Sequence, residues 1–202
     1  MGGFDDAGKT RLRREFAGRR RALSEAEVAS ASRAICAWIV SSAEFRETRH
    51  LVLYSPRANE VDPGEVAKRA SEQGLPTYYP RVEGDDLAFR RAVAADLHPG
   101  PFGVEEPPSG AARLPGDAAG VLVLVPGVAF DRRGGRLGSG RGYYDRALPT
   151  LRHATRFGLA AEALVVDRLP QDPWDVCMNA VVTERGILPT PTATTVHSGE
   201  LT

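Results

Sequence analysis

Uninterrupted apolar runs alternate along the chain with segments in which apolar residues recur at helical spacing. The strongest run, residues 121–125, is typical of a strand buried on both faces of a parallel sheet. Shorter runs predict strands over residues 51–54, 75–80, 87–90 and 156–160, and a last strand over 180–184. Because strands alternate with helices, we predict one α/β domain with a mostly parallel open sheet flanked by helices.

Two helices are predicted at the start of the chain. Leu12, Phe16 and Leu23 share one face at helical spacing, and arginines cover much of the rest of that helix. Ser24 and Glu27 form a capping-box pattern that predicts the start of the next helix. Its apolar stripe predicts a core-facing side that includes a packed tryptophan; the stripe is Val28, Ala31, Ile35, Trp38 and Ile39.

A segment rich in glycine and arginine follows the central strand, which Pro126 and Gly127 should end. We expect a loop up to Gly142 and a short helix over residues 143–151. Ligands bind at the carboxyl ends of strands in open α/β sheets, glycine lets backbone amides approach an anion, and arginine supplies forked donors. The segment therefore predicts a phosphate cradle, although it lacks the Lys-Ser/Thr of a P-loop and the spacing of the dinucleotide fingerprint. A flexible, solvated loop is the alternative.

Composition narrows the function classes. The 202 residues carry a formal net charge of zero, which argues against electrostatic binding of nucleic acid. Cys36 and Cys177 are far apart and form no metal or disulfide pattern. No apolar run is long enough to span a membrane and no signal-peptide pattern begins the chain, so we expect a cytoplasmic protein that makes no membrane contact. We also expect a monomer.

The glycine segment also resembles a known family signature. PGVAFD at residues 126–131 and RLGSGRGYYDR at residues 136–146 are similar to the signature of the 5-formyltetrahydrofolate cyclo-ligase family, also called 5,10-methenyltetrahydrofolate synthetases. Further segments match in order between Lys9 and Thr183, including YSPRANEVD at residues 54–62. The resemblance implies an ATP- and Mg²⁺-dependent ligase that converts 5-formyltetrahydrofolate to 5,10-methenyltetrahydrofolate, with release of ADP and phosphate. Phosphorylation of the formyl oxygen would precede ring closure by N10.

The resemblance also implies site residues. The expected ATP contacts are Lys9, Arg13, Arg136, Leu137, Gly138, Ser139, Gly140, Arg141, Gly142, Tyr143 and Tyr144. The expected folate contacts are Tyr54, Glu60 and Tyr143, and the expected Mg²⁺ ligands are Asp145 and Asp175. Arg136, Arg141 and Tyr143 are the expected catalytic residues.

Some positions depart from the family pattern and keep alternatives open. Trp174 stands where the family usually has histidine, Asn179 where it often has aspartate, and Ser139 where many members have a basic or bulky residue. One alternative is a non-catalytic nucleotide- or RNA-associated module that kept the glycine segment. Another is an unrelated ATP-dependent ligase on the same fold. We expect the domain to cover residues 1–188, and the polar residues 189–202 to form a disordered tail.

Overall fold

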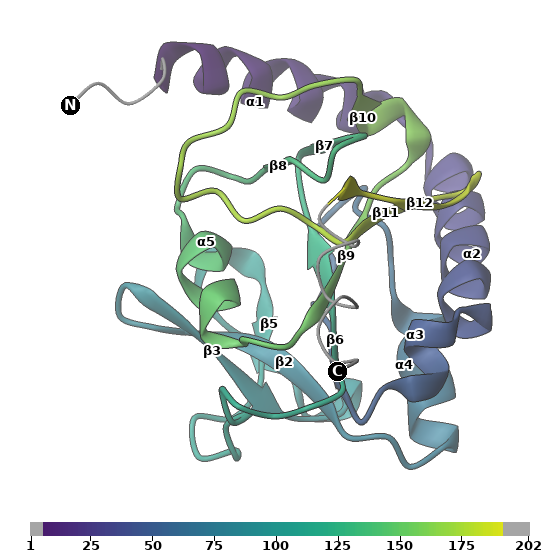
Figure 1. Cartoon of the computed structure of the whole chain (residues 1–202), viewed down its shortest axis with the longest axis vertical. Helices are drawn as coiled ribbons and strands as arrows, with labels where there is room; N and C mark the ends of the chain where they lie inside the picture. Colours follow the sequence, from purple (N-terminus) through teal and green to yellow (C-terminus); the bar gives the residue numbers. More distant parts are fainter. Residues whose placement is uncertain (1–5, 192–202) are drawn as a thin grey trace, which may run out of the picture.

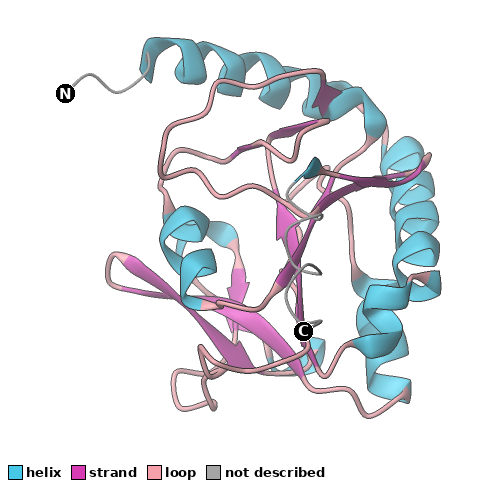
Figure 2. Ribbon diagram, in the orientation of Figure 1, coloured by secondary structure: helices cyan, strands magenta, loops and turns pink. Residues whose placement is uncertain are grey.

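A seven-stranded sheet forms the centre of the computed structural model, which describes residues 6–191. Its strand order is β12-β11-β9-β6-β1-β2-β3, and the inner strands from β11 to β2 all run parallel. β12 and β3 pair antiparallel at the two edges. Figures 1 and 2 show α2, α3 and α4 together on one side of the sheet and α5 on the other. The predicted α/β class and mostly parallel sheet are confirmed.

The described part of the chain contains five α-helices and twelve strands. The helices are α1 (Asp6–Ala22), α2 (Glu25–Ser41), α3 (Ala43–Glu47), α4 (Gly64–Glu72) and α5 (Tyr143–Ala147). The strands of the main sheet are β1 (His50–Val52), β2 (Thr77–Glu83), β3 (Asp86–Arg91), β6 (Val121–Pro126), β9 (Thr155–Leu159), β11 (Ala180–Thr183) and β12 (Gly186–Pro189). The short strands outside it are β4 (His98–Pro99), β5 (Glu105–Glu106), β7 (Ala129–Asp131), β8 (Arg136–Leu137) and β10 (Val165–Val166).

β6 separates two hydrophobic cores. Val121, Val123 and Val125 point into the core that contains α5, whereas Leu122 and Leu124 point into the core beneath α2 and α4. Successive side chains of a strand alternate between faces, so a strand covered on both sides must be apolar throughout. This is the physical reason for the unbroken apolar run.

The predicted start of α2 is confirmed, but the prediction for its apolar stripe is partly wrong. The Ser24 side chain accepts from the Glu27 amide, and the Glu27 carboxylate accepts from the Ser24 amide, as the capping box predicts. Trp38 is 44% exposed instead of packed, and its indole N–H donates to the Glu184 carbonyl at 3.4 Å. The apolar stripe of α2 is therefore narrower than predicted.

The folded part of the chain continues further toward the C-terminus than predicted. β11 is followed by β12, in which Pro189 pairs with Ala180. The Thr190 hydroxyl is buried and donates to the Met178 carbonyl at 2.5 Å. The folded domain therefore extends beyond residue 188, and residues 192–202 of the expected tail lie outside the described part of the chain.

The glycine segment is more regular than a loop. β7 and β8 form an antiparallel hairpin, and β10 pairs parallel with β7 to make a separate three-stranded sheet. Phe130 of β7 is fully buried and belongs to the core that contains α5. The predicted loop therefore contains two short strands, β7 and β8, that are held in place by strand pairing.

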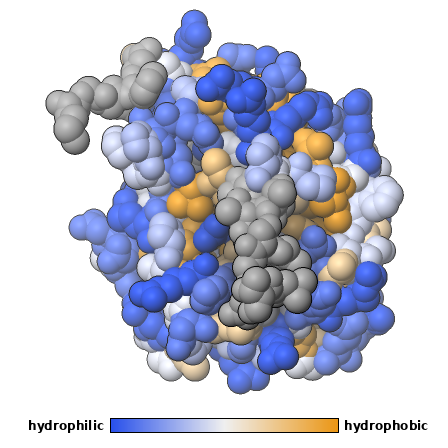
Figure 3. All heavy atoms as spheres, in the orientation of Figure 1, coloured by the Kyte–Doolittle hydropathy of each residue, from blue (hydrophilic) through white to orange (hydrophobic). Residues whose placement is uncertain are grey.

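The surface is mostly hydrophilic on the face drawn in Figure 3, where hydrophobic residues lie in small scattered groups. Among residues 6–191, no helix has the length and apolar character needed to cross a lipid bilayer.

Candidate active site

The site lies where the strand order reverses direction. From β1 the chain continues outward to β2, whereas β6 continues outward on the other side to β9. The segments that leave the carboxyl ends of β1 and β6 therefore diverge, which leaves room for a ligand between them. A cavity of about 610 Å³ lies there, between Tyr54 and Glu60 after β1 and residues 126–128 after β6. Pockets of this size accept one small organic ligand.

A buried carboxylate fixes the glycine segment. Asp131 is 1% exposed and accepts hydrogen bonds from the backbone amides of Arg133, Gly135 and Leu169, at 2.9, 2.7 and 2.9 Å. These bonds satisfy a buried charge and join the hairpin turn to the segment before Asp175. Gly134 has φ +91°, and a Cβ there would lie 2.5 Å from the Met178 carbonyl oxygen, so only glycine fits this turn.

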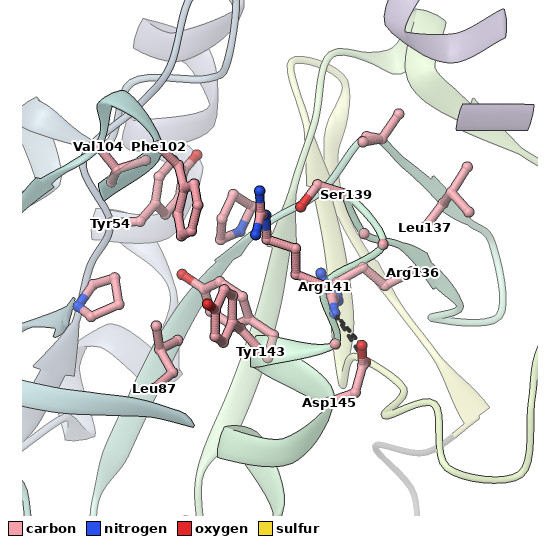
Figure 4. Close-up of a pocket in the computed structure, with 18 of the residues that line it drawn as sticks. Tyr54, Leu87, Phe102, Val104, Arg136, Leu137, Ser139, Arg141, Tyr143 and Asp145 are labelled. Carbon is pink, nitrogen blue, oxygen red and sulfur yellow. Dashed lines mark hydrogen bonds and ion pairs between the residues drawn. The ribbon is translucent and has the colours of Figure 1, made fainter. Parts of the chain in front are cut away.

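An ion pair joins the two ends of the glycine segment. Arg136 on β8 donates from Nη2 to both carboxylate oxygens of Asp145 on α5, at 2.9 and 3.0 Å, along the dashed line in Figure 4. Their side chains are only 6% and 21% exposed. The Arg136 guanidinium also lies 5.3 Å from the ring centre of Tyr144, and burial raises the pKa of that phenol. The pair holds α5 against the hairpin.

A second cationic group approaches from α1. The Lys9 amine donates to Asp172 at 2.7 Å and to Asp175 at 2.5 Å, and the Lys9 side chain is 8% exposed. Burial alone would lower the pKa of Lys9, but the hydrogen bonds to both carboxylates outweigh it and raise that pKa. Arg13, one turn further along α1, donates from Nε to the Gly138 carbonyl at 3.1 Å. The arginine-rich helix thus supplies these two basic groups to the site, in addition to Arg20.

Glu60 has a partner that the sequence did not indicate. Arg20 of α1 donates to Oε1 of Glu60 at 2.7 Å, and the Arg57 amide donates to Oε2 at 2.9 Å. The adjacent Tyr54 is buried and donates its hydroxyl to the Val61 carbonyl at 2.6 Å. Burial raises the pKa of Tyr54, so its phenol stays protonated at neutral pH.

Aromatic and cationic side chains stack across the cavity. The guanidinium of Arg141 lies 3.7 Å from the ring centre of Phe102, and the ring of Tyr143 lies 6.4 Å from that of Phe102. Figure 4 shows Arg141 extending from the glycine segment toward Phe102, which lies near Tyr54 and Val104. Arg136, Leu137 and Asp145 lie on the other side of the view. The cavity therefore has an aromatic side and a cationic side.

Every site residue predicted from the sequence lines this one cavity, although the residues come from four separate segments of the chain. The structure adds Arg20, Asp172, Phe102 and Trp174 to the lining, and Trp174 is 64% exposed. Arg20 belongs to an arginine run with no local feature that distinguishes it. Asp172, by contrast, is three residues before Asp175 and shares its segment, a spacing that could have indicated it.

The carboxylates of Asp145 and Asp175 are of the type that binds Mg²⁺, but an Mg²⁺ ion bound to them would need further ligands. Both offer hard carboxylate oxygens, but the described residues contain no group of three acidic, histidine or cysteine side chains placed to hold a metal. Mg²⁺ in phosphate-transfer sites is commonly held by one or two carboxylates together with water and phosphate oxygens. The donor set therefore suits a metal that arrives with a phosphate-bearing substrate.

The site and its sequence segments match a known family as a unit. Residues 5–184 match the model of the 5-formyltetrahydrofolate cyclo-ligase family. This chain belongs to that family. A 5-formyltetrahydrofolate cyclo-ligase of Mycolicibacterium smegmatis is 31% identical over 195 residues, with 89% of this chain and 96% of the relative covered. One from Haemophilus influenzae is 30% identical, with 66% and 74% covered.

Solved structures of cyclo-ligase relatives share the fold. The 5,10-methenyltetrahydrofolate synthetase of Aquifex aeolicus has a TM-score of 0.80 and 33% identity, with 96% of this chain and 95% of the other covered. The synthetase of Mycoplasma pneumoniae has a TM-score of 0.69 and 26% identity, with 87% and 98% covered.

One departure from the cyclo-ligase pattern has a structural explanation. The side-chain oxygen of Asn179 accepts from the Arg156 amide at 2.9 Å, next to the start of β11. An aspartate oxygen could accept the same bond, so the asparagine keeps this contact without a charge. The position does not line the cavity.

Proposed function

We propose that this enzyme converts 5-formyltetrahydrofolate to 5,10-methenyltetrahydrofolate with consumption of ATP. The observation that carries the proposal is that one cavity combines the arginine- and glycine-rich segment and Lys9 with the Tyr54–Glu60 wall. Membership of the cyclo-ligase family supports the same reaction.

The cationic side suits a triphosphate. Lys9, Arg13, Arg136 and Arg141 line the cavity together with the backbone of residues 137–142. Gly140 and Gly142 have φ +96° and +69°, a left-handed conformation that favours glycine and allows successive backbone amides to turn toward an anion. In the proposed complex these groups orient the phosphates and compensate their charge, which is most of what phosphoryl transfer requires from a protein.

The aromatic side suits the pterin of the folate. Phe102, Tyr143 and Tyr54 provide flat apolar surfaces, and Glu60 is the carboxylate at that wall. We propose that Glu60 accepts hydrogen bonds from pterin N–H groups, since a carboxylate with two oxygens can receive two parallel donors. Arg20 would then hold the Glu60 carboxylate in position.

The chemistry explains why two ligands must meet in one cavity. The N5-formyl group is an amide whose oxygen is a poor leaving group. In the proposed reaction the formyl oxygen attacks the γ-phosphorus of ATP and ADP leaves. N10 then attacks the activated formyl carbon, and the oxygen departs with phosphate. Tyr143 and Arg141 lie on the path between the two sides of the cavity, where we propose that they orient the formyl group.

Mg²⁺ is the proposed companion of ATP, and when bound it would neutralise phosphate charge. Its proposed ligands, Asp145 and Asp175, are now paired with Arg136 and Lys9. Two of the four predicted phosphate-binding cations, Lys9 and Arg136, therefore each have a predicted metal ligand as a partner. Binding of MgATP would let the cations turn to phosphate and the carboxylates to the metal, so no charge in the site loses its compensation.

The proposal is tested by mixing the purified protein with 5-formyltetrahydrofolate and MgATP and following the near-ultraviolet absorbance of the methenyl product. Removal of ATP, or of the metal by a chelator, should abolish the signal. Arg136→Ala should lower kcat/KM for ATP about 10- to 150-fold, the equivalent of about 1.5–3 kcal/mol for one charge-assisted contact. The matched control is Arg132→Ala, because Arg132 belongs to the same segment but pairs with Glu162 outside the cavity. An absence of methenyl product with a folded protein would favour a non-catalytic nucleotide-binding module.

A further inference from the structure

The amine of Lys9 is held by two carboxylates from one distant segment. Lys9 is on α1, and Asp172 and Asp175 lie 163 and 166 positions later in the sequence. The side chains of the three residues are 8%, 12% and 13% exposed. A lysine has four rotatable bonds, so its amine stays in one place only when buried partners hold it there.

The two carboxylates have different surroundings. Oδ2 of Asp175 accepts a second hydrogen bond, from the Asp172 amide at 2.8 Å, which ties Asp175 to its own segment. Asp172 uses Oδ2 for Lys9, and its Oδ1 is buried with no hydrogen-bond partner among the described residues. Lys9 is also the one ion-pair partner of Asp172 in the described part of the chain.

An unsatisfied buried carboxylate oxygen is unfavourable for folding, and an apolar side chain of similar volume would avoid that cost. A carboxylate at this position therefore points to a task that needs its charge. Among the described residues its one charged contact is the amine of Lys9, so that amine is where the charge acts.

We propose that Asp172 is a positioning residue that holds Lys9 in the cavity and acts on nucleotide binding through Lys9. The proposal rests on the proposed function, in which Lys9 contacts phosphate. It explains why two carboxylates are needed: Asp175 is the proposed Mg²⁺ ligand, and a carboxylate that binds a dication holds an ammonium group less strongly. Asp172 would keep Lys9 directed into the site at that stage.

The chain offers a direct test that needs no ligand. It contains only two lysines, Lys9 and the exposed Lys68 on α4. Brief acetylation with acetic anhydride, read by peptide mass spectrometry, gives the rate at Lys9 relative to that at Lys68 in one sample. Asp172→Asn keeps the size of the side chain and removes its charge. This variant should raise the acetylation rate of Lys9 about tenfold, because Lys9 loses one charge-assisted contact. The acetylation rate of Lys68 should not change. Asp172→Glu should raise the Lys9 rate less.

The matched control is Asp167→Asn, because Asp167 precedes the same segment but its side chain is fully exposed and does not line the cavity. This variant should leave the Lys9 rate unchanged. If Asp172→Asn fails to fold, which circular dichroism would show, Asp172→Ser, which also removes the charge, takes its place in the comparison with wild type. An unchanged Lys9 rate in every folded Asp172 variant would overturn the proposal.

A second arm asks whether Asp172 acts through Lys9. In the wild-type background, Asp172→Asn should raise KM for ATP several-fold with a smaller change in kcat. In a Lys9→Gln background the same substitution should leave KM for ATP unchanged. Equal effects in both backgrounds would show that Asp172 acts independently of Lys9 and would overturn the proposal. Because acetylation is measured without nucleotide, it still reports on the Lys9–Asp172 contact if the proposed ATP-dependent reaction is wrong.

Discussion

Asp145 compensates a guanidinium that water hardly reaches. The Arg136 side chain is 6% exposed, and both oxygens of Asp145 accept from it at 2.9 and 3.0 Å. Asp145→Asn keeps the shape of the side chain but removes its charge, so the Arg136 cation stays buried without compensation. Removal of one partner from a buried pair costs about 3–5 kcal/mol. Since Asp145 itself is 21% exposed, water can replace part of the lost interaction, and we expect a loss of about 3 kcal/mol.

Such a loss is large enough to measure by thermal and urea denaturation. For a chain of 202 residues it corresponds to a fall in Tm of about 6–12 °C. The control is Asp86→Asn, since Asp86 is 76% exposed and 3.7 Å from Arg146. That exposed pair should contribute less than about 0.5 kcal/mol. Activity measured against Mg²⁺ concentration tests the proposed metal role of Asp145 separately from its stability role.

The double variant separates a buried charge from other effects of the substitution. In an Arg136→Met background no cation remains to be compensated, so Asp145→Asn should cost much less than it does alone. The reasoning is refuted if Asp145→Asn alone is as stable as wild type. It is also refuted if the substitution costs the same with and without Arg136.

Two other predictions concern a substrate contact and acid stability. Glu60→Gln should raise KM for the folate by about tenfold and KM for ATP by much less, because the lost charge faces the proposed pterin side. The control is Glu65→Gln, on the exposed face of α4. Equal increases in KM for both substrates would contradict the role of Glu60. The hydrogen bond from Arg90 holds the pKa of Glu83 below its ordinary value of 4.5, partly opposed by burial and aided by Arg113. Because the folded pKa is lowered, Glu83 stabilises the fold well above pH 4.5 and loses this contribution as the pH falls through the folded pKa. Glu83→Gln should therefore cost about 1 kcal/mol in urea denaturation at neutral pH, and the difference from wild type should shrink in acid; a constant difference would contradict the assignment.

The parts of the fold that could be predicted from the sequence are those set by local pattern. The apolar run in β6 predicted a strand covered on both faces, and Ser24 and Glu27 predicted the start of α2. β12 was missed because its short sequence, Gly186–Pro189, is only partly buried and ends in proline, so it carries no strand pattern. Trp38 was misplaced because helical spacing gives the angle of a side chain but not the width of the surface that covers it.

The site, like the fold, has parts that local sequence pattern predicts and parts that depend on contacts between distant segments. The glycine segment could be predicted because its chemistry is concentrated in a short stretch, and the cavity does include it. Arg20 could not be predicted, because its partner Glu60 lies 40 positions away. The spacing of Asp172 from Asp175 could have indicated Asp172, but its contact with Lys9, 163 positions away, appears only in the folded chain. Only the folded chain shows which of many arginines and aspartates meet.

The route of one oxygen atom tests the central claim most directly. No residue in the cradle is placed as a covalent nucleophile, since the exposed Ser139 has no base beside it among the described residues. We therefore expect direct transfer from ATP to the formyl oxygen. With substrate carrying heavy oxygen at the formyl group, mass spectrometry should find the label in inorganic phosphate, one label for each methenyl product. Label found in water instead would show that the oxygen leaves without phosphorylation, and the proposed role of ATP in this site would be wrong.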